Sequence, residues 1–328
     1  MKTKFTALLL SLSLLLTLCV GCAQDKPETP ADNRPQTTQS TETTPDVKPS
    51  KEVSTEVTFT DMMGREIMLD KPAERIVVLA ASDCEILYAI GAGETLVGRG
   101  EYCDYPAQAL QVPAIGSGGE TNIEQIIALQ PDVLLMNDMD QSKEQVEQLE
   151  KAGITVVMSN DSDIAEVYTA IEMIGVLTGK NDNAAAVIDS MKTTFADIQA
   201  KSTGDGTQTV YFEVSPLQWG LWTAGTDTFM DEIATMLGLK NCFSDVSGWA
   251  EISEEQVLER NPDFIVTITM YFGEGPTPEE EILSRAGWEN VTAVKNGKIL
   301  NLQNNELSRP APRLADGAQM LFDFVYGE

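Results

Sequence analysis

One short pattern of residues occurs twice in this chain. Residues 122–136 read NIEQIIALQPDVLLM and residues 253–267 read SEEQVLERNPDFIVT. Aligned without a gap, the two segments share a Glu-Gln pair, a Pro-Asp pair and an apolar run after it. Helical spacing before the proline and a continuous apolar run after it predict a short helix, a turn and a buried strand in each copy. A chain that repeats this unit is expected to fold as two α/β lobes.

Each copy opens with a residue suited to begin a helix. Asn122 and Ser253 are good N-cap residues, and each is followed three positions later by a glutamine, which predicts a capping box. Glu124 and Glu255 then fall in the first helical turn, where the helix dipole favours a carboxylate. Capping alone would explain the motif. Its duplication would in addition place two glutamates at matching helix starts, where a partner with paired cationic sites could dock.

The residues around the motif alternate between strand and helix patterns. From 56 to 163 the sequence predicts a hairpin at 57–70 around Gly64, a buried strand at 76–79, a helix capped by Ser82 and ended by Gly91, and strands at 96–98 and 133–136. Residues 164–202 show helical spacing with a break near 179–183, and from 203 to 328 the alternation returns. The prediction is an α/β fold of two pseudo-equivalent Rossmann-like lobes, joined by one long linker helix, with a ligand cleft between them.

The N-terminus carries the pattern of an exported lipoprotein. Residues 1–21 combine Lys2 and Lys4 with an apolar stretch too short for a transmembrane helix, which predicts a signal peptide. Cys22 follows a small residue, as in a bacterial lipobox, so we expect acyl chains such as palmitate on Cys22 and attachment to the extracytoplasmic face of the cell membrane. Residues 22–55 are rich in Pro, Thr and charged residues without apolar periodicity, which predicts a disordered tether.

Composition excludes several classes of function. The formal net charge of −29 argues against binding to nucleic acid or to anionic lipid headgroups. The chain has no histidine, which excludes Ser-His-Asp and Cys-His catalysis and histidine-ligated zinc or haem. Cys84, Cys103 and Cys242 remain when the signal peptide and the lipidated cysteine are set aside, and this odd number predicts no complete disulfide framework.

From residue 57 to the end, the chain resembles a known family. FTDMMGREIML, RIVVL, LYAIGAGETLVGRGEYCDYP, both copies of the repeat, TAGTDTF and LSRPAPRL resemble, in order, the iron-siderophore and cobalamin class of ABC-importer substrate-binding proteins. The resemblance implies the class III periplasmic-binding-protein fold. It also implies a metal chelate carried as cargo rather than a resident cofactor, and a monomer that delivers this chelate to a membrane permease with its ATPase. In that family one glutamate on each lobe is thought to pair with permease arginines, and Glu124 and Glu255 match these positions.

The resemblance further implies a cleft lined by the loops that follow the strands. The expected lining residues are Ser82, Tyr102, Ser117, Asn137, Ser215, Trp249, Tyr271 and Arg309. Tyr102 and Trp249 match positions at which cobalamin binders hold aromatic side chains against the corrin. Gly118, Asn137 and Val214 stand where some corrinoid binders carry further aromatics.

The charges of these loops bear on the cargo. The loops contain the basic residues Arg99, Arg309 and Arg313 and the acidic residues Glu101, Asp104, Glu120, Asp138, Glu213 and Glu306. An acidic rim disfavours polyanionic catecholates, so the expected cargo is a corrinoid or a ferric hydroxamate siderophore. Arg313 is expected to brace Asp316 or a helix end rather than to touch the ligand.

Two other functions stay open at this point. The same fold could serve a ligand sensor or scaffold lipoprotein that signals to a receptor. An extracytoplasmic hydrolase would need a pair of carboxylates, such as Asp104 with Glu120 or Glu213. In a chain with 51 acidic residues such pairs are expected by chance, and we expect no enzyme activity.

Overall fold

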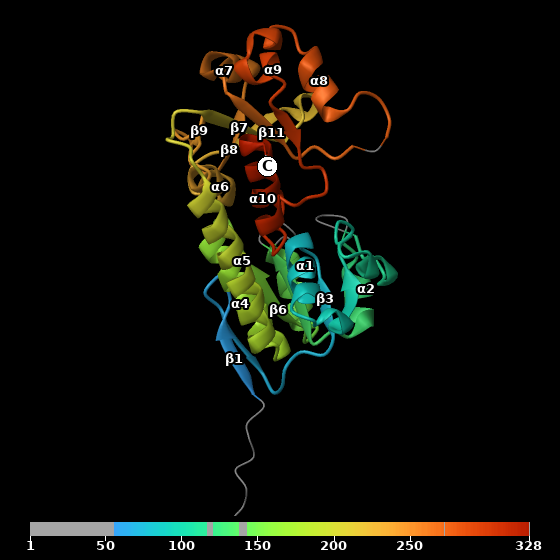
Figure 1. The fold of residues 1–328 in the computed structure, drawn as a ribbon. Coiled ribbons are helices and arrows are strands. Elements are labelled where there is room, and N and C mark those ends of the chain that lie inside the picture. The colour runs from blue at the N-terminus through green and yellow to red at the C-terminus, as the bar shows by residue number, and fades with distance from the viewer. Residues whose placement is uncertain (1–55, 117–120, 138–142, 272, 328) are drawn as a thin grey trace, which may run out of the picture. The chain divides into compact units, whose positions relative to one another are not determined.

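Figure 1 shows the fold as a computed structural model, which describes residues 56–116, 121–137, 143–271 and 273–327. Residues 53–328 form one compact unit. The predicted signal peptide (1–21), the lipidated Cys22 and the tether (22–55) lie outside the described residues, as do Ser117, Gly118, Glu120 and Asp138. Within the described part of the chain, no helix has the length and apolar content needed to span a membrane.

A hairpin and a parallel sheet make up the N-terminal lobe. The hairpin forms as predicted, with Gly64 in the left-handed region at φ +78°. The sheet has the order β4-β3-β5-β6, and every pairing in it is parallel, as its continuous apolar strands predict. The strands are β1 (Val57–Thr60), β2 (Glu66–Leu69), β3 (Ile76–Val78), β4 (Leu96–Arg99), β5 (Val133–Asn137) and β6 (Thr155–Ser159). The helices are α1 (Ala81–Ala89), α2 (Ile123–Leu129) and α3 (Lys143–Lys151), with 3-10 turns η1 (Gly93–Thr95) and η2 (Ala107–Gln111).

The start of α1 differs from the prediction. Ala80 occupies the N-cap position with extended backbone and no side-chain cap, so Ser82 lies buried in the first turn instead of capping the helix. The chain needs only two residues after β3 to turn into the helix, which therefore begins before Ser82 is reached. The predicted end is correct, because Gly91 follows the C-cap in the left-handed conformation at φ +74°.

Two helices, rather than one, lie between the lobes. α4 (Ile164–Thr178) ends at Gly179, which is left-handed at φ +67°, and α5 (Asn181–Lys201) begins two residues later. α4 packs against α1 and β1, whereas α5 contacts α4, α6 and α10. The break predicted near residues 179–183 is therefore present, and the long α5 is the helix that links the two sets of elements.

The C-terminal lobe adds antiparallel strands to the parallel plan. As predicted, β7 (Thr209–Ser215), β11 (Phe264–Thr267) and β12 (Ile299–Asn301) pair in parallel. The sequence analysis missed β8 (Leu221–Ala224) and β10 (Trp249–Ile252), which extend the sheet antiparallel beyond β7, and the short β9 (Lys240–Asn241). The sheets of the two lobes are therefore equivalent only over their parallel strands.

Helices cover both faces of this second sheet. Figure 1 shows α7, α8 and α9 on one face and α6 and α10 on the other. Tyr211, Ile265 and Trp288 belong to the buried cluster on the first face, and Phe212, Val266 and Phe322 to the core on the second. The helices are α6 (Phe229–Met236), α7 (Glu254–Arg260), α8 (Pro278–Ser284), α9 (Thr292–Lys295) and α10 (Leu314–Tyr326), with turns η4 (Leu217–Trp219) and η5 (Trp288–Asn290).

The repeated motif folds alike in both lobes. α2 and α7 each end in a left-handed residue, Gln130 at φ +48° and Asn261 at φ +45°, directly before the shared proline. The aspartate after that proline bonds the start of the neighbouring strand: Asp132 accepts the backbone N–H groups of Glu74 and Arg75 at 2.9 Å, ahead of β3.

The second copy repeats this contact and differs at the helix start. Asp263 accepts the N–H of Thr209 at 2.8 Å, at the first residue of β7. The full capping box forms at Ser253, whereas Asn122 caps α2 with its side chain but donates its own N–H to the carbonyl of Ile115.

Candidate functional site

The candidate site lies at the carboxyl ends of the parallel strands. Asn137 is the last residue of β5 and Ser215 the last of β7, while Tyr102 and Tyr271 lie in loops that follow β4 and β11. Carboxyl ends of parallel strands lie at one edge of a sheet, and ligands of such folds bind there. The structure thus places these four side chains where the strand pattern predicts a ligand site; that they touch ligand stays a prediction.

A cavity of about 430 Å³ joins residues of both lobes at this edge. Its neutral amides, Gln303, Asn304 and Asn305, follow β12. The other described lining residues are Asp104, Tyr105, Met270, Glu306 and Arg313. None of the seven predicted cleft residues in the described chain is among them, although Tyr271 directly follows Met270. A larger depression of about 530 Å³, lined by Arg65, Glu150 and Val156 among others, lies by β2 and the start of β6, and so away from the carboxyl ends.

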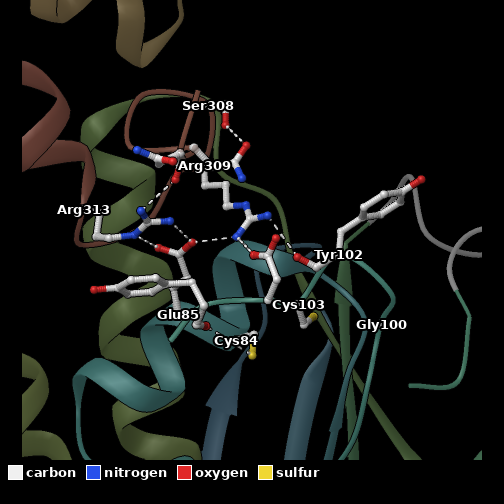
Figure 2. Close-up of polar contacts among 12 residues, drawn as sticks. Cys84, Glu85, Gly100, Tyr102, Cys103, Ser308, Arg309 and Arg313 are labelled. Atoms are coloured by element: carbon white, nitrogen blue, oxygen red, sulfur yellow. Dashed lines mark hydrogen bonds and ion pairs between the residues drawn. The ribbon is translucent and has the colours of Figure 1, made fainter. Parts of the chain in front are cut away.

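Arg309 is buried and fully engaged by the N-terminal lobe. Figure 2 shows its guanidinium between two carboxylates: Nη1 donates to Glu85 at 2.9 Å and to Asp104 at 2.7 Å. Nη2 donates to the backbone carbonyl of Tyr102 at 3.0 Å. Burial tends to lower the pKa of Arg309, but the hydrogen bonds to Asp104 and Glu85 raise it above its usual value. The predicted role of Arg309 as a ligand contact is therefore not supported by this geometry.

Arg313 also binds Glu85, which differs from the expected role of Arg313. Its Nε and Nη2 donate to the two oxygens of Glu85 at 2.8 and 2.6 Å, and its guanidinium stacks 3.8 Å from the Tyr105 ring. Arg313 was expected to brace Asp316 or a helix end, and it instead holds a carboxylate far away in the sequence. Because Glu85 is 2% exposed, the two arginines are needed to compensate its burial.

Exposed aromatic side chains lie in the loops after β4 and β7 and at the start of β10. Tyr102 is 66% exposed, whereas Trp249 is 40% exposed and packs on Phe229 of α6 at 5.5 Å between ring centroids. Sequence reasoning missed Trp219, which is 74% exposed, and Trp222, which pairs in register with Ser215 at the carboxyl end of β7. The segment PLQWGLW directly after the predicted strand carried the signal, since two tryptophans in a post-strand loop are candidates for ligand contact.

Glu213 was placed on the acidic rim by the sequence, and this is wrong. Its side chain is 1% exposed and takes two hydrogen bonds from Arg285, at 2.7 and 2.9 Å. Burial would lower the pKa of Arg285, but its bonds to Glu213 and Glu281 raise that pKa. With Glu213 bound to Arg285 and Asp104 bound to Arg309, these two carboxylates do not form the acid-base pair that a hydrolase would require.

Two further acids lie beside Ser82. Asp83 is fully buried and accepts the hydroxyl of Ser159, the last residue of β6, at 2.7 Å. Asp161 follows two residues later, and its Oδ2 has no hydrogen-bond partner within the described chain. Burial, with the nearby charges of Asp83 and Glu166, raises the pKa of Asp161 to about 8. Among the described residues, no cluster of Cys, Asp or Glu has the geometry to hold a metal ion.

The two glutamates of the repeat are exposed in the first turns of α2 and α7. α2 follows β4, a parallel strand of the N-terminal sheet, and α7 follows β10, an added strand of the C-terminal sheet. The pKa of Glu255 is lowered by hydrogen bonds from its own backbone N–H and from the Ser253 hydroxyl, which keeps this carboxylate charged. Glu124 and Glu255 are thus matched anionic groups that point into solvent.

Comparison with known proteins agrees with this geometry. The model of the periplasmic binding protein family matches residues 76–306. The chain is 34% identical over 276 residues to the ABC transporter substrate-binding lipoprotein YvrC of Bacillus subtilis strain 168, covering 82% of this chain and 85% of that protein.

Two solved structures share the fold. A possible iron-binding (periplasmic solute-binding) protein from Staphylococcus epidermidis ATCC 12228 superposes with a TM-score of 0.65 at 31% identity, over 78% of this chain and 100% of the other. The periplasmic vitamin B12-binding protein BtuF of Vibrio cholerae does so with a TM-score of 0.65 at 25% identity, over 78% and 97%. The expected class III fold is confirmed, and the chain belongs to the periplasmic binding protein family, among the substrate-binding proteins of ABC transporters.

Proposed function

We propose that this protein captures a corrinoid, or a comparable neutral or cationic metal chelate, and delivers it to the permease of an ABC importer. The observation that carries the choice of cargo is the state of the two arginines near the cavity. Arg309 and Arg313 are both hydrogen-bonded to carboxylates, so neither offers an unpaired positive charge to an anionic ligand. The cavity offers three neutral amides and two acids instead. Similarity to a vitamin B12-binding protein and to a possible iron-binding protein supports the chelate class.

A binding screen tests the cargo. Cyanocobalamin, dicyanocobinamide, ferrioxamine B, haemin and a ferric tricatecholate are titrated calorimetrically and scored by thermal shift. We expect binding of the corrinoids, with ferrioxamine B as the next best, because these ligands need no cationic partner. Binding of the anionic haemin or tricatecholate in preference to all three others would overturn the proposal.

Delivery to the permease is assigned to Glu124 and Glu255. Each is exposed in the first turn of one copy of the repeated motif, where a cationic side chain of a partner can reach it without desolvating the core. Loss of either carboxylate should reduce cobalamin uptake at least about tenfold and leave the affinity for cargo unchanged. Glu259→Ala, an exposed acid on the same helix as Glu255, is the matched control and should transport normally. Loss of cargo affinity in Glu124→Ala or Glu255→Ala would contradict the docking role.

The remaining parts of the assembly follow from this role. Acyl chains on Cys22 would hold the protein at the extracytoplasmic face of the cell membrane, the tether 22–55 would give the folded unit reach, and a cytoplasmic ATPase would drive the permease. A monomer suffices, because both glutamates belong to one chain. Metabolic labelling with palmitate checks the anchor: Cys22→Ser should abolish the label, and a labelled Cys22→Ser protein would contradict it.

A further inference from the structure

The loop 100–106 carries Tyr102, the most exposed aromatic side chain of the N-terminal lobe. Two sets of contacts hold this loop, one at its start and one further along it. Its base is seated on β3: the Gly100 N–H donates to the Val78 carbonyl at 2.7 Å, and the Cys103 thiol points at the carbonyls of residues 78–80. A side chain at Gly100 would place its Cβ 2.3 Å from the Leu79 carbonyl, so only glycine fits there. These contacts fix where the loop leaves the sheet.

The outer part of the loop is held from the other end of the chain. Arg309 lies in the segment between β12 and α10, and it bonds both the Asp104 carboxylate and the Tyr102 carbonyl. Figure 2 shows the Tyr102 ring directed away from the guanidinium, while its backbone is turned towards it. Arg309 therefore contacts the backbone of this loop and leaves the aromatic face of Tyr102 open.

The two carboxylates that share Arg309 differ in exposure. The Glu85 side chain is 2% exposed and is also bonded to Arg313, whereas the Asp104 side chain is 40% exposed. Glu85 thus neutralises and orients the guanidinium. The hydrogen bond to Asp104 is the side-chain contact that joins the guanidinium to the loop.

We propose that Arg309 is a positioning residue for cargo retention: it clamps the loop 100–106 through Asp104 and the Tyr102 carbonyl and does not itself touch the ligand. The part of this inference that concerns cargo retention rests on the proposed function. The geometric part, the clamp on the loop, holds for the protein without ligand. Removing the clamp should let the Tyr102 ring sample other positions, so that bound cargo dissociates faster.

The test uses the whole folded protein and four variants. Asp104→Asn removes the charge from one clamp contact, Arg309→Gln removes the guanidinium that makes both, and the double variant completes the double-mutant cycle. Arg65→Gln is the matched control, because Arg65 also bonds two carboxylates and one backbone carbonyl, but at the edge strand β6. Hydrogen exchange without ligand reports the clamp, and dissociation of radiolabelled cyanocobalamin by rapid filtration reports retention.

We expect faster exchange over residues 100–106 in Asp104→Asn and in Arg309→Gln, with no change there in Arg65→Gln. Dissociation should accelerate about tenfold in Arg309→Gln, which loses both contacts, and less in Asp104→Asn, which keeps the bond to the Tyr102 carbonyl. The double variant should match Arg309→Gln, because no contact of Arg309 then remains for the change at Asp104 to weaken. Unchanged exchange in both Arg309→Gln and Asp104→Asn, the second of which removes only a half-exposed charge and should fold, would overturn the clamp.

Cargo binding separates the remaining outcomes. A loss confined to haemin in Arg309→Gln, not reproduced by Asp104→Asn, would mean that Arg309 binds ligand directly and would also overturn the proposal. Absence of binding by every probe to the unmodified protein would reject the proposed cargo and leave the clamp to be judged by hydrogen exchange.

Discussion

In the N-terminal lobe the sheet is wholly parallel, whereas in the C-terminal lobe β8 and β10 extend it in the antiparallel sense. The lobes agree in the repeated helix, the left-handed residue before the proline and the aspartate that bonds the next strand. They differ in the added strands, which carry Trp222 and Trp249, and in how they treat buried acids. Equivalence is thus kept over the repeated motif, and it is lost on the side of β7 that carries the added strands.

The buried acids provide the largest test of this difference. Glu213 in the C-terminal lobe is compensated by Arg285, and both side chains are 1% exposed. Arg285→Ala would leave the Glu213 carboxylate buried without a cation, and we expect a loss of about 3–5 kcal/mol in the free energy of unfolding. Lys151→Ala is the control: the side chains of its ion pair with Glu147 are 77% and 50% exposed, and its loss should cost about 1 kcal/mol or less. Denaturant unfolding followed by circular dichroism measures both, and equal losses would refute the distinction.

Asp161 in the N-terminal lobe provides the second test, because no basic group is among the causes of its pKa shift. Its pKa of about 8 lies above that of an unfolded aspartate, so between these two values the folded state binds the extra proton. Stability contributed by the protonated form is therefore complete at low pH and is lost as pH rises towards 8. Asp161→Asn should remove this decline, which we place at about 3–4 kcal/mol between pH 5 and 8. Parallel curves of melting temperature against pH for the two proteins would contradict the assignment.

The aspartates of the repeat test equivalence itself. Asp132→Ala removes two backbone hydrogen bonds ahead of β3, and Asp263→Ala removes the bonds to the N–H and hydroxyl of Thr209 at β7. Each change should cost about 1–2 kcal/mol of unfolding free energy. Similar losses would support a shared structural role, whereas a large loss in one lobe only would show that the match in sequence hides a difference in energetics.

The smallest expected effect distinguishes the two helix starts. The Gln256 side chain accepts the Ser253 N–H at 2.9 Å, but the corresponding N–H of Asn122 is taken by the Ile115 carbonyl. Gln256→Ala should therefore cost about 0.5 kcal/mol, and Gln125→Ala close to nothing. Chemical denaturation of the two variants measures both losses of unfolding free energy. A larger loss in Gln125→Ala than in Gln256→Ala would contradict this explanation of capping.

Local patterns predicted the parallel core well, because strands buried on both faces and helices ended by glycine leave signals within a few residues. β5, α7 and the hairpin around Gly64 follow from such signals. The antiparallel strands β8 and β10 have four residues each and no clear alternation, so only their pairing defines them.

The site was less predictable than the fold. The strand pattern placed Asn137 and Ser215 at the carboxyl ends of β5 and β7, where the structure has them, but side-chain partners were missed. Arg309 and Glu85 meet across more than two hundred residues of sequence, and Glu213 is bonded by Arg285, which directly follows α8, a helix that the pattern did not show. Charge alone suggested an acidic rim. In the fold, Arg285 neutralises Glu213 and Arg309 neutralises Asp104, and no local sequence spacing reveals these partners.

The tryptophans of this chain all belong to one lobe. The four indoles, at positions 219, 222, 249 and 288, lie in or beside the C-terminal sheet, and residues 56–163 contain none. Ultraviolet light absorbed by indole alone therefore reports on the second lobe. The fluorescence of one unlabelled sample can thus follow the loosening of that half without any signal from the first lobe.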